Sequence, residues 1–242
     1  FPKFGQIAVD SLVEGQDIVD DKDLGMTTQS VQTSEVGGKV ILTDRLLKQN
    51  VATNWRSVGR QIGDAHARRY DEDLVGLFSG LNGGTDLGAA NTPLTAENAM
   101  AIITTAQADK YGTDIRFVGH PVCTARLGRD LSTVGSGTIA AVPEGFSASQ
   151  LSKFWTGITL VMVPFFQTAN ISRDSLDDAV CGIFDKSAIG LLTSQGVRRE
   201  RQRDASLRAW ELVFTADYAA FEHDEDRGAP VTLDAATPST TI

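Results

Sequence analysis

The sequence predicts an α+β protein, because long extended segments and amphipathic helices both occur in it. Three features carry this expectation: a polar extended segment over residues 4–42, a long amphipathic helix over residues 43–80, and two long strands over residues 195–203 and 208–221. The 242 residues suit one large domain or two modest ones. A Gly- and Ser-rich stretch at residues 128–150 is expected to form loops with short strands.

The N-terminal segment has no strongly apolar face. We expect a strand at residues 4–13, an acidic tip at residues 17–23, and a second extended run at residues 26–42 that is rich in Thr, Val, Gln and Ser. An isolated hairpin of this polarity is marginally stable in water. We therefore expect the segment to become ordered against a neighbouring subunit. A surface hairpin of the monomer is the alternative.

The long helix follows directly. Apolar residues recur at spacings of three and four through residues 43–80, which predicts one apolar helix face. Thr43 or Asp44 can cap its start. Gly59 and Gly63 lie four residues apart inside it, so we expect either a strand to approach closely there or the helix to bend or break.

Shorter elements are expected in the middle of the chain. His120-Pro121 is typical of a turn or a helix start. The run that ends before Pro164 has the composition of a buried strand. The expected elements are a helix at residues 95–111 with Thr95 as its N-cap, strands at residues 116–118, 156–163 and 180–184, and a short helix at residues 187–194.

The composition excludes several classes of protein. The chain has 22 basic and 31 acidic residues, a formal net charge of −9, which argues against a dedicated nucleic-acid binder. Its two cysteines are too few for a disulfide framework or a thiolate metal cage, so a reducing cytoplasmic origin is expected. No apolar run approaches the roughly 20 residues that cross a bilayer. The chain opens without methionine, so we expect residues upstream of it.

Two groups of residues have the composition of a catalytic or metal site. His120 lies three residues before Cys123, and residues 222–226 offer five consecutive metal-ligand side chains. A buried cysteine and a solvated acidic turn are the favoured interpretations, because neither spacing matches a known nucleophile setting or calcium loop. We therefore expect no enzyme, metal or cofactor. A thiol- or metal-dependent enzyme remains the alternative from another class.

A cluster of arginines at residues 198–208 is the remaining feature, and we call it the basic cluster. Arginine is the residue preferred for bidentate pairing with carboxylates across protein interfaces, which favours interface pairing over nucleic-acid contact or simple solvation. The acidic tip at residues 17–23 offers carboxylates with which these arginines can pair. The predicted interface residues are Arg198, Arg199, Arg201, Arg203, Asp204 and Arg208 in the cluster, with Asp17, Asp20, Asp21, Lys22 and Asp23 at the tip.

Taken in order, these features resemble the major capsid proteins of tailed bacteriophages, the Hong Kong 97-type fold. The likeness covers nearly the whole chain and is specific as an ordered set. It rests on residues 36–44, 63–65, 71–74, 117–121, 197–198, 203–204 and 208–212.

The resemblance implies a structural subunit of the virion, which assembles in the host cytoplasm into pentamers and hexamers around double-stranded DNA. Portal, scaffolding and decoration proteins are the further partners that it implies, with no membrane. An encapsulin-type compartment is the alternative within the same fold. The implied parts are an E-loop (1–42), a peripheral domain with the spine helix (43–111), an axial domain (112–195), a peripheral hairpin with its P-loop near Asp204 (196–224), and a C-terminal segment (225–242).

In some members of this family, the subunits are covalently cross-linked by an isopeptide bond between an E-loop lysine and a P-loop asparagine. Lys22 lies near the expected loop tip, but Ala205 occupies the P-loop neighbourhood. No asparagine follows Ile171. The resemblance therefore implies no such cross-link in this chain.

Overall fold

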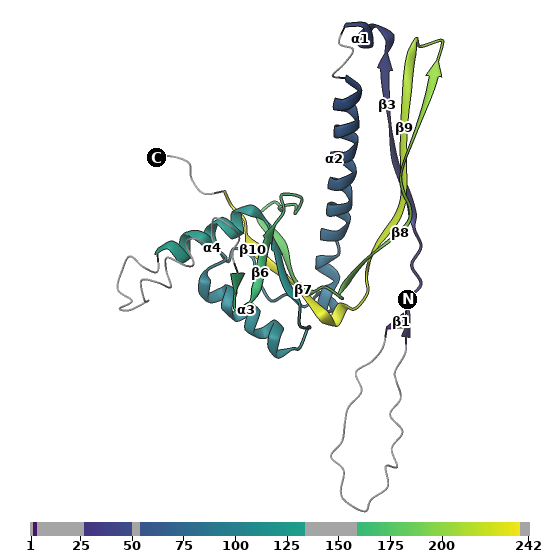
Figure 1. Ribbon diagram of the computed structural model, residues 1–242. Coiled ribbons are helices and arrows are strands. Elements are labelled where there is room, and N and C mark those ends of the chain that lie inside the picture. Colours follow the sequence, from purple (N-terminus) through teal and green to yellow (C-terminus); the bar gives the residue numbers. More distant parts are fainter. Residues whose placement is uncertain (1, 4–26, 50–53, 134–158, 238–242) are drawn as a thin grey trace, which may run out of the picture.

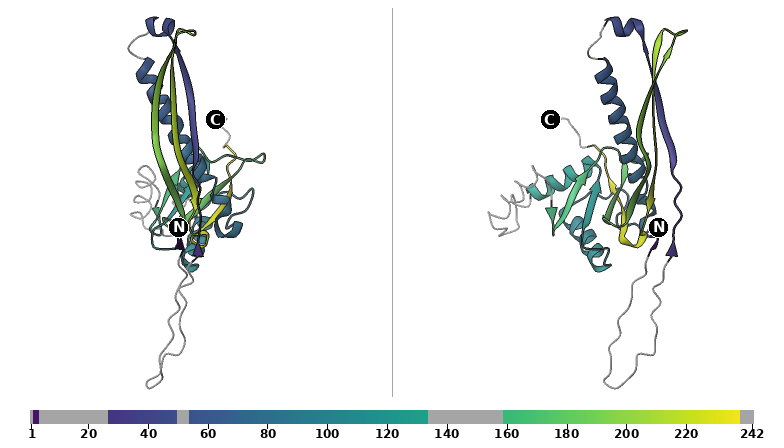
Figure 2. Two further views of the ribbon diagram at one scale, coloured as in Figure 1. Left: turned by 90° about the vertical axis from the view of Figure 1, so that its right-hand side faces the viewer. Right: turned by 45° about the vertical axis from the view of Figure 1, so that its right-hand side comes forward.

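Two larger sheets and one two-stranded sheet organise the described part of the chain (Figure 1). The computed structural model describes residues 2–3, 27–49, 54–133 and 159–237. A five-stranded sheet and its helices form one part, which we call the body. A three-stranded sheet and a helix beside it form an elongated part, which we call the tower (Figures 1 and 2). In the described residues, no helix is both long and apolar enough to span a membrane.

The tower consists of three antiparallel strands and helix α2. The strands lie in the order β3 (Ser34–Thr43), β9 (Ala209–Glu222) and β8 (Ile189–Asp204). Helix α2 (Asn54–Val75) runs alongside them (Figure 2). With 16 residues at about 3.3 Å each, β8 spans roughly 50 Å. The expected pair of long strands joined by a turn is confirmed, and β8 begins before residue 195.

Aromatic contacts join α2 to β9. His66 is buried and meets Phe214 edge-on at a centroid distance of 5.0 Å. One turn further along, Tyr70 meets Tyr218 edge-on at 4.3 Å. The Tyr218 hydroxyl donates a hydrogen bond to the Asp73 carboxylate at 2.5 Å. These contacts hold one face of α2 against the sheet.

Strand β3 corrects the expectation for the N-terminal segment. Its ten residues pair antiparallel with β9 of the same chain, from Ser34 opposite Tyr218 to Thr43 opposite Ala209. A backbone ladder does not need a strongly apolar face, and Leu42 anchors the strand in a buried position. Ordering only against another copy is therefore wrong for residues 34–43.

The start of the chain also contacts its own body. Short strand β1 (Pro2–Lys3) pairs with β2 (Thr27–Thr28). The Lys3 ammonium lies 2.8 Å from the Asp224 carboxylate. The expected strand at residues 4–13 and the acidic tip at residues 17–23 lie outside the described residues.

The single long helix expected over residues 43–80 is wrong. The structure divides this stretch into α1 (Asp44–Gln49), α2 and the 3-10 helix η1 (Phe78–Gly84). Thr43 Oγ1 accepts a hydrogen bond from Leu46 N at 3.4 Å, so the expected cap lies at the start of α1. The spacing of apolar residues continues past the end of α2 into η1, so periodicity alone did not show where α2 ends.

The body is built on a mixed sheet with the order β10, β7, β4, β6, β5. Only the pairing of β4 with β6 is parallel. Helices α3 and α4 pack against this sheet (Figure 1). The elements are α3 (Ala96–Ala108), β4 (Ile115–Gly119), α4 (Pro121–Thr133), β5 (Thr159–Leu160), β6 (Val163–Gln167), β7 (Asp178–Asp185), the 3-10 helix η2 (Glu225–Arg227) and β10 (Gly228–Asp234).

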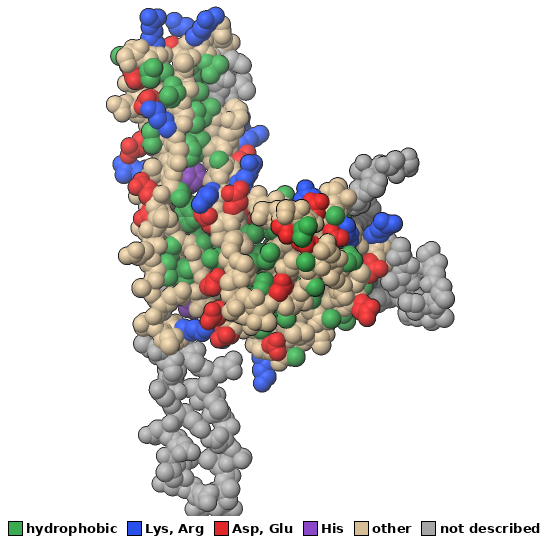
Figure 3. Space-filling model, turned by 180° about the vertical axis from the view of Figure 1, so that it is seen from behind, with side chains coloured by type: hydrophobic (Ala, Val, Ile, Leu, Met, Phe, Trp, Pro, Cys, Tyr) green, Lys and Arg blue, Asp and Glu red, His purple; other side chains and the backbone are tan. Residues whose placement is uncertain are grey.

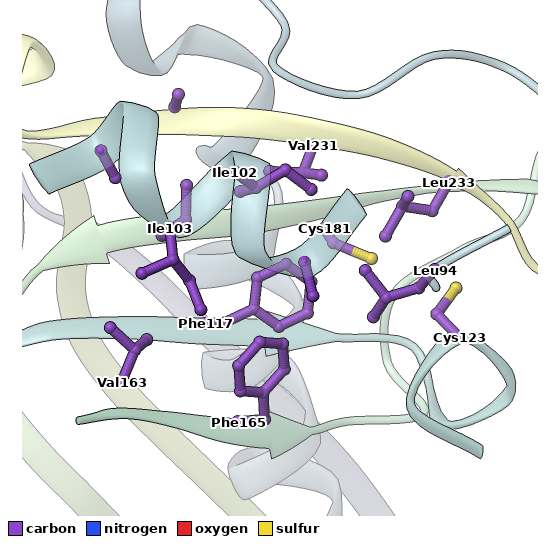
Figure 4. Packing of buried hydrophobic residues seen from close by; sticks show 14 of the residues in the cluster. Leu94, Ile102, Ile103, Phe117, Cys123, Val163, Phe165, Cys181, Val231 and Leu233 are labelled. Atoms are coloured by element: carbon purple, nitrogen blue, oxygen red, sulfur yellow. The ribbon is translucent and has the colours of Figure 1, made fainter. Parts of the chain in front are cut away.

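The hydrophobic core lies between α3 and the sheet. Ile102 and Ile103 of α3 face Phe117 and Phe165, whose rings lie 4.7 Å apart (Figure 4). Residues of η1, α3, β7 and β10 all join this one core. Residues before and after the domain boundary expected between residues 111 and 112 therefore share this one core, because α3 packs on β7.

Several expectations for the body are confirmed. Thr95 caps α3 by accepting a hydrogen bond from Asn98 N at 3.2 Å. The strands expected at residues 116–118 and 180–184 lie within β4 and β7. The helix start at Pro121 is the start of α4.

Other expectations for the body are wrong. Residues 128–133 continue α4 instead of forming a loop. The strand expected at residues 156–163 is a hairpin, with β5 and β6 joined at Val161 and Met162, and Pro164 lies inside β6. Residues 187–194 start β8 instead of forming a helix. At residues 156–163 and 187–194, a short apolar run was compatible with more than one structure. Pairing with a neighbouring strand decided which structure formed.

Candidate functional site

The far end of the tower brings the start of α1 to the turn between β8 and β9. The Arg203 guanidinium donates two parallel hydrogen bonds to the Asp44 carboxylate, each 2.7 Å long. The same guanidinium lies over the Trp210 ring, 5.4 Å from its centroid. These hydrogen bonds hold the pKa of Asp44 below its ordinary value. Arg203 therefore has a partner in its own chain, and its pairing with the acidic tip stays a prediction, because the tip lies outside the described residues.

The turn itself uses Asp204. Its carboxylate accepts hydrogen bonds from the Ser206 hydroxyl at 2.7 Å, from Ser206 N at 2.8 Å and from Leu207 N at 3.1 Å. The Ser206 hydroxyl is the main cause of a lowered Asp204 pKa. Arg208 adopts a left-handed conformation with φ 47°, and its carbonyl accepts a hydrogen bond from Asp44 N at 2.9 Å. Asp204 thus stabilises the turn from inside.

A groove runs between α2 and β8. Its volume is about 470 Å³, and its lining combines apolar side chains with arginines: Trp55, Gly59, Ile62, Arg199, Glu200, Arg201, Leu212, Val213 and Phe214. Arg199 and Arg201 alternate along β8, so they share one face of the strand. Arg201 also lies 5.8 Å from the centroid of the Trp210 ring. The groove can accept a segment that has both apolar and acidic side chains.

Of the two glycines expected to mark a close approach, Gly59 lines this groove and Gly63 lies one helical turn further along α2. A Cβ atom built on Gly59 or Gly63 meets no atom within 4 Å. No described part of the same chain therefore approaches α2 at these positions, and the close approach within the chain is wrong. Space is therefore left beside Gly59 and Gly63 on α2.

Positive charge gathers on the outer half of the tower (Figure 3). Residues 39–60 and 198–211 hold ten basic and four acidic side chains, in a chain whose net charge is −9. Arg198 pairs with Glu200 at 2.7 Å, and Lys39 pairs with Glu211. Six arginines of this region make no ion pair with another described residue: Arg45, Arg56, Arg60, Arg199, Arg201 and Arg208. These cations are available to an external acidic partner.

The structure does not assemble a thiol site from His120 and Cys123. His120 Nδ1 accepts a hydrogen bond from Val122 N at 3.3 Å, and burial lowers the His120 pKa. The Cys123 thiol is fully buried and lies 3.6 Å from the Asp234 carbonyl oxygen. A substrate in solvent does not reach this thiol.

The acidic run at residues 222–226 forms ion pairs. Asp224 binds the Lys3 ammonium at 2.8 Å and Arg227 Nε at 2.9 Å. Burial raises the pKa of Glu222. Among the described residues, no three metal-ligand side chains come together in a group that could hold a metal ion.

Solved structures supply the decisive comparison. The head structure of Helicobacter pylori bacteriophage KHP40 matches with a TM-score of 0.68 and 8% identity, over 97% of this chain and 83% of that chain. The capsid of cyanophage P-SCSP1u matches with a TM-score of 0.64 and 14% identity, over 98% and 83%. The chain has the fold of tailed-phage capsid proteins. No family model matches the sequence, and the search of curated proteins finds no match.

The capsid fold also occurs outside phages. An encapsulin complex from Synechococcus elongatus PCC 7942 matches with a TM-score of 0.62 and 15% identity, over 93% of this chain and 80% of that chain. This likeness places the chain in a fold that both phage capsids and an encapsulin share.

Sequence reasoning found the basic cluster but missed its internal partners. Asp44 was expected only as a possible helix cap, and Trp210 had no expected role. The register of β8 on β9 places Arg203 opposite Trp210, and α1 brings Asp44 to the same end. An alternating pattern of arginines beside an aromatic strand was the signal that could have indicated the groove.

Proposed function

We propose that the chain is the major capsid protein of a tailed bacteriophage, many copies of which assemble into the icosahedral shell around the double-stranded DNA genome. The observation that carries the proposal is the likeness to phage capsid structures over nearly the whole chain, body and tower together. The net charge of −9 agrees with it, because a container for DNA should not adhere to its contents strongly.

In this proposal the parts take the roles of the capsid fold. Residues 1–42 are the E-loop, and its last residues, from Ser34 on, belong to β3 of the tower. Helix α2 is the spine helix, the body contains the axial domain, and the turn at residues 204–208 is the P-loop. Portal, scaffolding and decoration proteins are the proposed further partners, and the virion is the proposed location.

The contact between copies uses the groove beside α2. We place the N-terminal segment of one copy across the α2 helix of its neighbour. The segment at residues 7–24 carries six carboxylates and one lysine among apolar side chains, which complements the groove's apolar lining and arginines. Arg56, Arg60 and Arg199 are among the cations left for its acidic tip. Near the P-loop, further arginine–carboxylate pairs tie adjacent capsomers together.

Deletion of residues 9–31 tests this contact. The deletion ends before β3, so the ladder between β3 and β9 is kept. We expect a folded subunit that stays soluble and does not close into shells, whereas the full chain forms particles of megadalton size. Normal shells from the deleted chain, seen by size-exclusion chromatography and electron microscopy, would contradict the proposed contact.

An encapsulin-type compartment is the second candidate, supported by the encapsulin structure that shares the fold. The contents of purified particles separate the two functions. Packaged DNA and a portal vertex support the phage shell, whereas an enclosed protein cargo supports the compartment.

A further inference from the structure

The C-terminal half of α2 is held from two sides. The helix lies between the body and the three-stranded sheet of the tower (Figures 1 and 2). Asp73 faces the sheet, where its carboxylate accepts the hydrogen bond from Tyr218. Asp71 lies two residues earlier, which places it about 200° away around the helix. Its carboxylate binds the body, so two acidic residues near the end of one helix contact the two parts of the molecule.

The body contributes two donors to Asp71. The Oδ2 atom of Asp71 accepts hydrogen bonds from Thr168 Oγ1 at 2.6 Å and from Asn170 Nδ2 at 2.7 Å. Both donors belong to the loop between β6 and β7. This loop is itself fixed, because Thr168 N donates to the Gly119 carbonyl at 3.1 Å and Ile171 is buried in the core. A charged acceptor strengthens both bonds. We call Asp71, Thr168 and Asn170 the latch.

The tower joins the body at three places along the chain: between α2 and η1, between β7 and β8, and between β9 and η2. The last two are tied together. His223 N and Asp224 N both donate to the Ala188 carbonyl, at 2.8 and 3.1 Å. Arg227 adds a hydrogen bond to the Ser187 hydroxyl at 3.3 Å. We call these paired connections the seam. The latch ties α2 to a different part of the body, the loop between β6 and β7.

A cleft lies beside the latch, between the end of α2 and the body. Its volume is about 400 Å³. The helix side of the lining includes Glu72, Val75 and Ser79, and the body side includes Asn170, Ser172 and Val180. Asn170 belongs to both the latch and the lining, so the latch lies at the edge of the cleft. Because side chains do not fill this space, close packing does not fix the helix against the body across it.

We infer that the latch fixes the angle between the tower and the body, and that its release lets the tower turn about the seam and close the cleft. Asp71 makes no ion pair in the part of the chain that the structure describes, so its two hydrogen bonds are the contact that is lost. Asp71 is thus a positioning residue. The inference concerns a single subunit and goes beyond the proposed shell function.

A distance measurement between two spin labels reports the angle. One label is placed on α2 at Arg60→Cys and the other on α3 at Met100→Cys, since both positions are exposed. The native cysteines are fully buried and should stay unlabelled. Labelled copies are diluted with an excess of unlabelled full chain, so distances between copies do not contribute. The measurement applies whether or not the chain forms shells, so failure of the inference is distinguishable from failure of the proposed function.

The parent should give one narrow distance distribution. Asp71→Ala and Thr168→Val should each broaden it and displace its mean, because each variant removes bonds of the latch. Thr168→Val keeps the carboxylate and a similar side-chain shape, so it tests the latch even if Asp71→Ala does not fold. Thr168→Ser keeps the hydroxyl and should give the parental distribution.

Asp64→Ala is the matched control on the same helix. Asp64 is exposed and makes no hydrogen bond or ion pair with a described residue, so its loss should leave the distribution unchanged. A parental distribution in both Asp71→Ala and Thr168→Val would overturn the inference. Equal broadening in Asp64→Ala would also overturn it, because the effect would then not be specific to the latch.

Filling the cleft tests the direction of the motion. Ser172 is exposed and lines the cleft, so Ser172→Trp places a large ring where the tower is expected to close. Added to Asp71→Ala, this substitution should narrow the distribution toward that of the parent. A distribution as broad as that of Asp71→Ala alone would show that the tower does not turn into the cleft, and would overturn the inferred motion.

Discussion

Arg203 and Asp44 lie 159 residues apart in sequence and join through two parallel hydrogen bonds of 2.7 Å. This pair ties the turn between β8 and β9 to the start of α1. At the outer end of the tower, this planar, charge-assisted contact is backed by the Trp210 ring and lies beside the hydrogen bond from Asp44 N to the Arg208 carbonyl.

Arg203→Lys should loosen this end of the tower. A lysine keeps the charge but cannot make the bidentate contact or the same stacking on Trp210. We expect faster amide hydrogen exchange in α1 and in the 204–208 turn, with exchange in the body unchanged. Arg198→Lys is the matched control, because in the described part of the chain Arg198 forms an ion pair only with exposed Glu200 on its own strand. Equal acceleration in both variants would contradict the role of the pair.

Acid should remove the same contact. The folded-state pKa of Asp44 is lowered by the Arg203 hydrogen bonds, so the stabilisation is present above the ordinary carboxyl pKa and is lost as the pH falls through the lowered value. The protection of α1 should therefore differ between the parent and Asp44→Asn at neutral pH and converge at strongly acidic pH. A difference that persists in acid would show that Asp44 acts by another route.

Two tyrosines provide a matched test of buried hydroxyl groups. Tyr218 donates to Asp73, whereas the buried Tyr111 hydroxyl has no hydrogen-bond partner among the described residues. Tyr218→Phe should cost about 1–2 kcal/mol, and Tyr111→Phe should be neutral or stabilising. Chemical denaturation of both variants measures the contrast. Equal losses would contradict the assigned partners.

The Tyr218 hydroxyl should lose its proton only at high pH. Burial, followed by the hydrogen bond to Asp73, raises the pKa of Tyr218 to about 12. Because the folded pKa lies above the unfolded one, the stabilisation is complete below about pH 10 and is lost as the pH rises toward 12. Burial also raises the pKa of Tyr111, so absorbance titration at the tyrosinate band should show a smaller late component in Tyr218→Phe than in the parent. A late component of unchanged amplitude in that variant would contradict the assignment to Tyr218.

The glycines of α2 separate folding from assembly. Apart from neighbouring backbone atoms of α2 itself, no described atom lies within 4 Å of a Cβ built on Gly59 or Gly63, so alanine at each should stabilise the subunit by about 1 kcal/mol. If a neighbouring copy lies against this side of α2, the same methyl groups should impair shell formation. A double alanine variant that is more stable and assembles normally would contradict the proposed position of the neighbour.

The sequence predicted elements whose signals are local. The cap at Thr95, the start of α4 at Pro121 and the turn between β8 and β9 all depend on nearby residues. It failed where pairing across the chain decides the structure: β3 is ordered by β9, and residues 187–194 become part of β8 for the same reason. The basic cluster was visible, but the partner of Arg203 depends on a fold that brings residue 44 to residue 203.

Cryo-electron microscopy of the purified full chain tests the central claim most directly. We expect closed icosahedral particles in which each tower contacts a neighbouring copy and α2 is covered by the N-terminal segment of that copy. A sample that contains only monomers or small oligomers under all assembly conditions, with α2 uncovered, would contradict it.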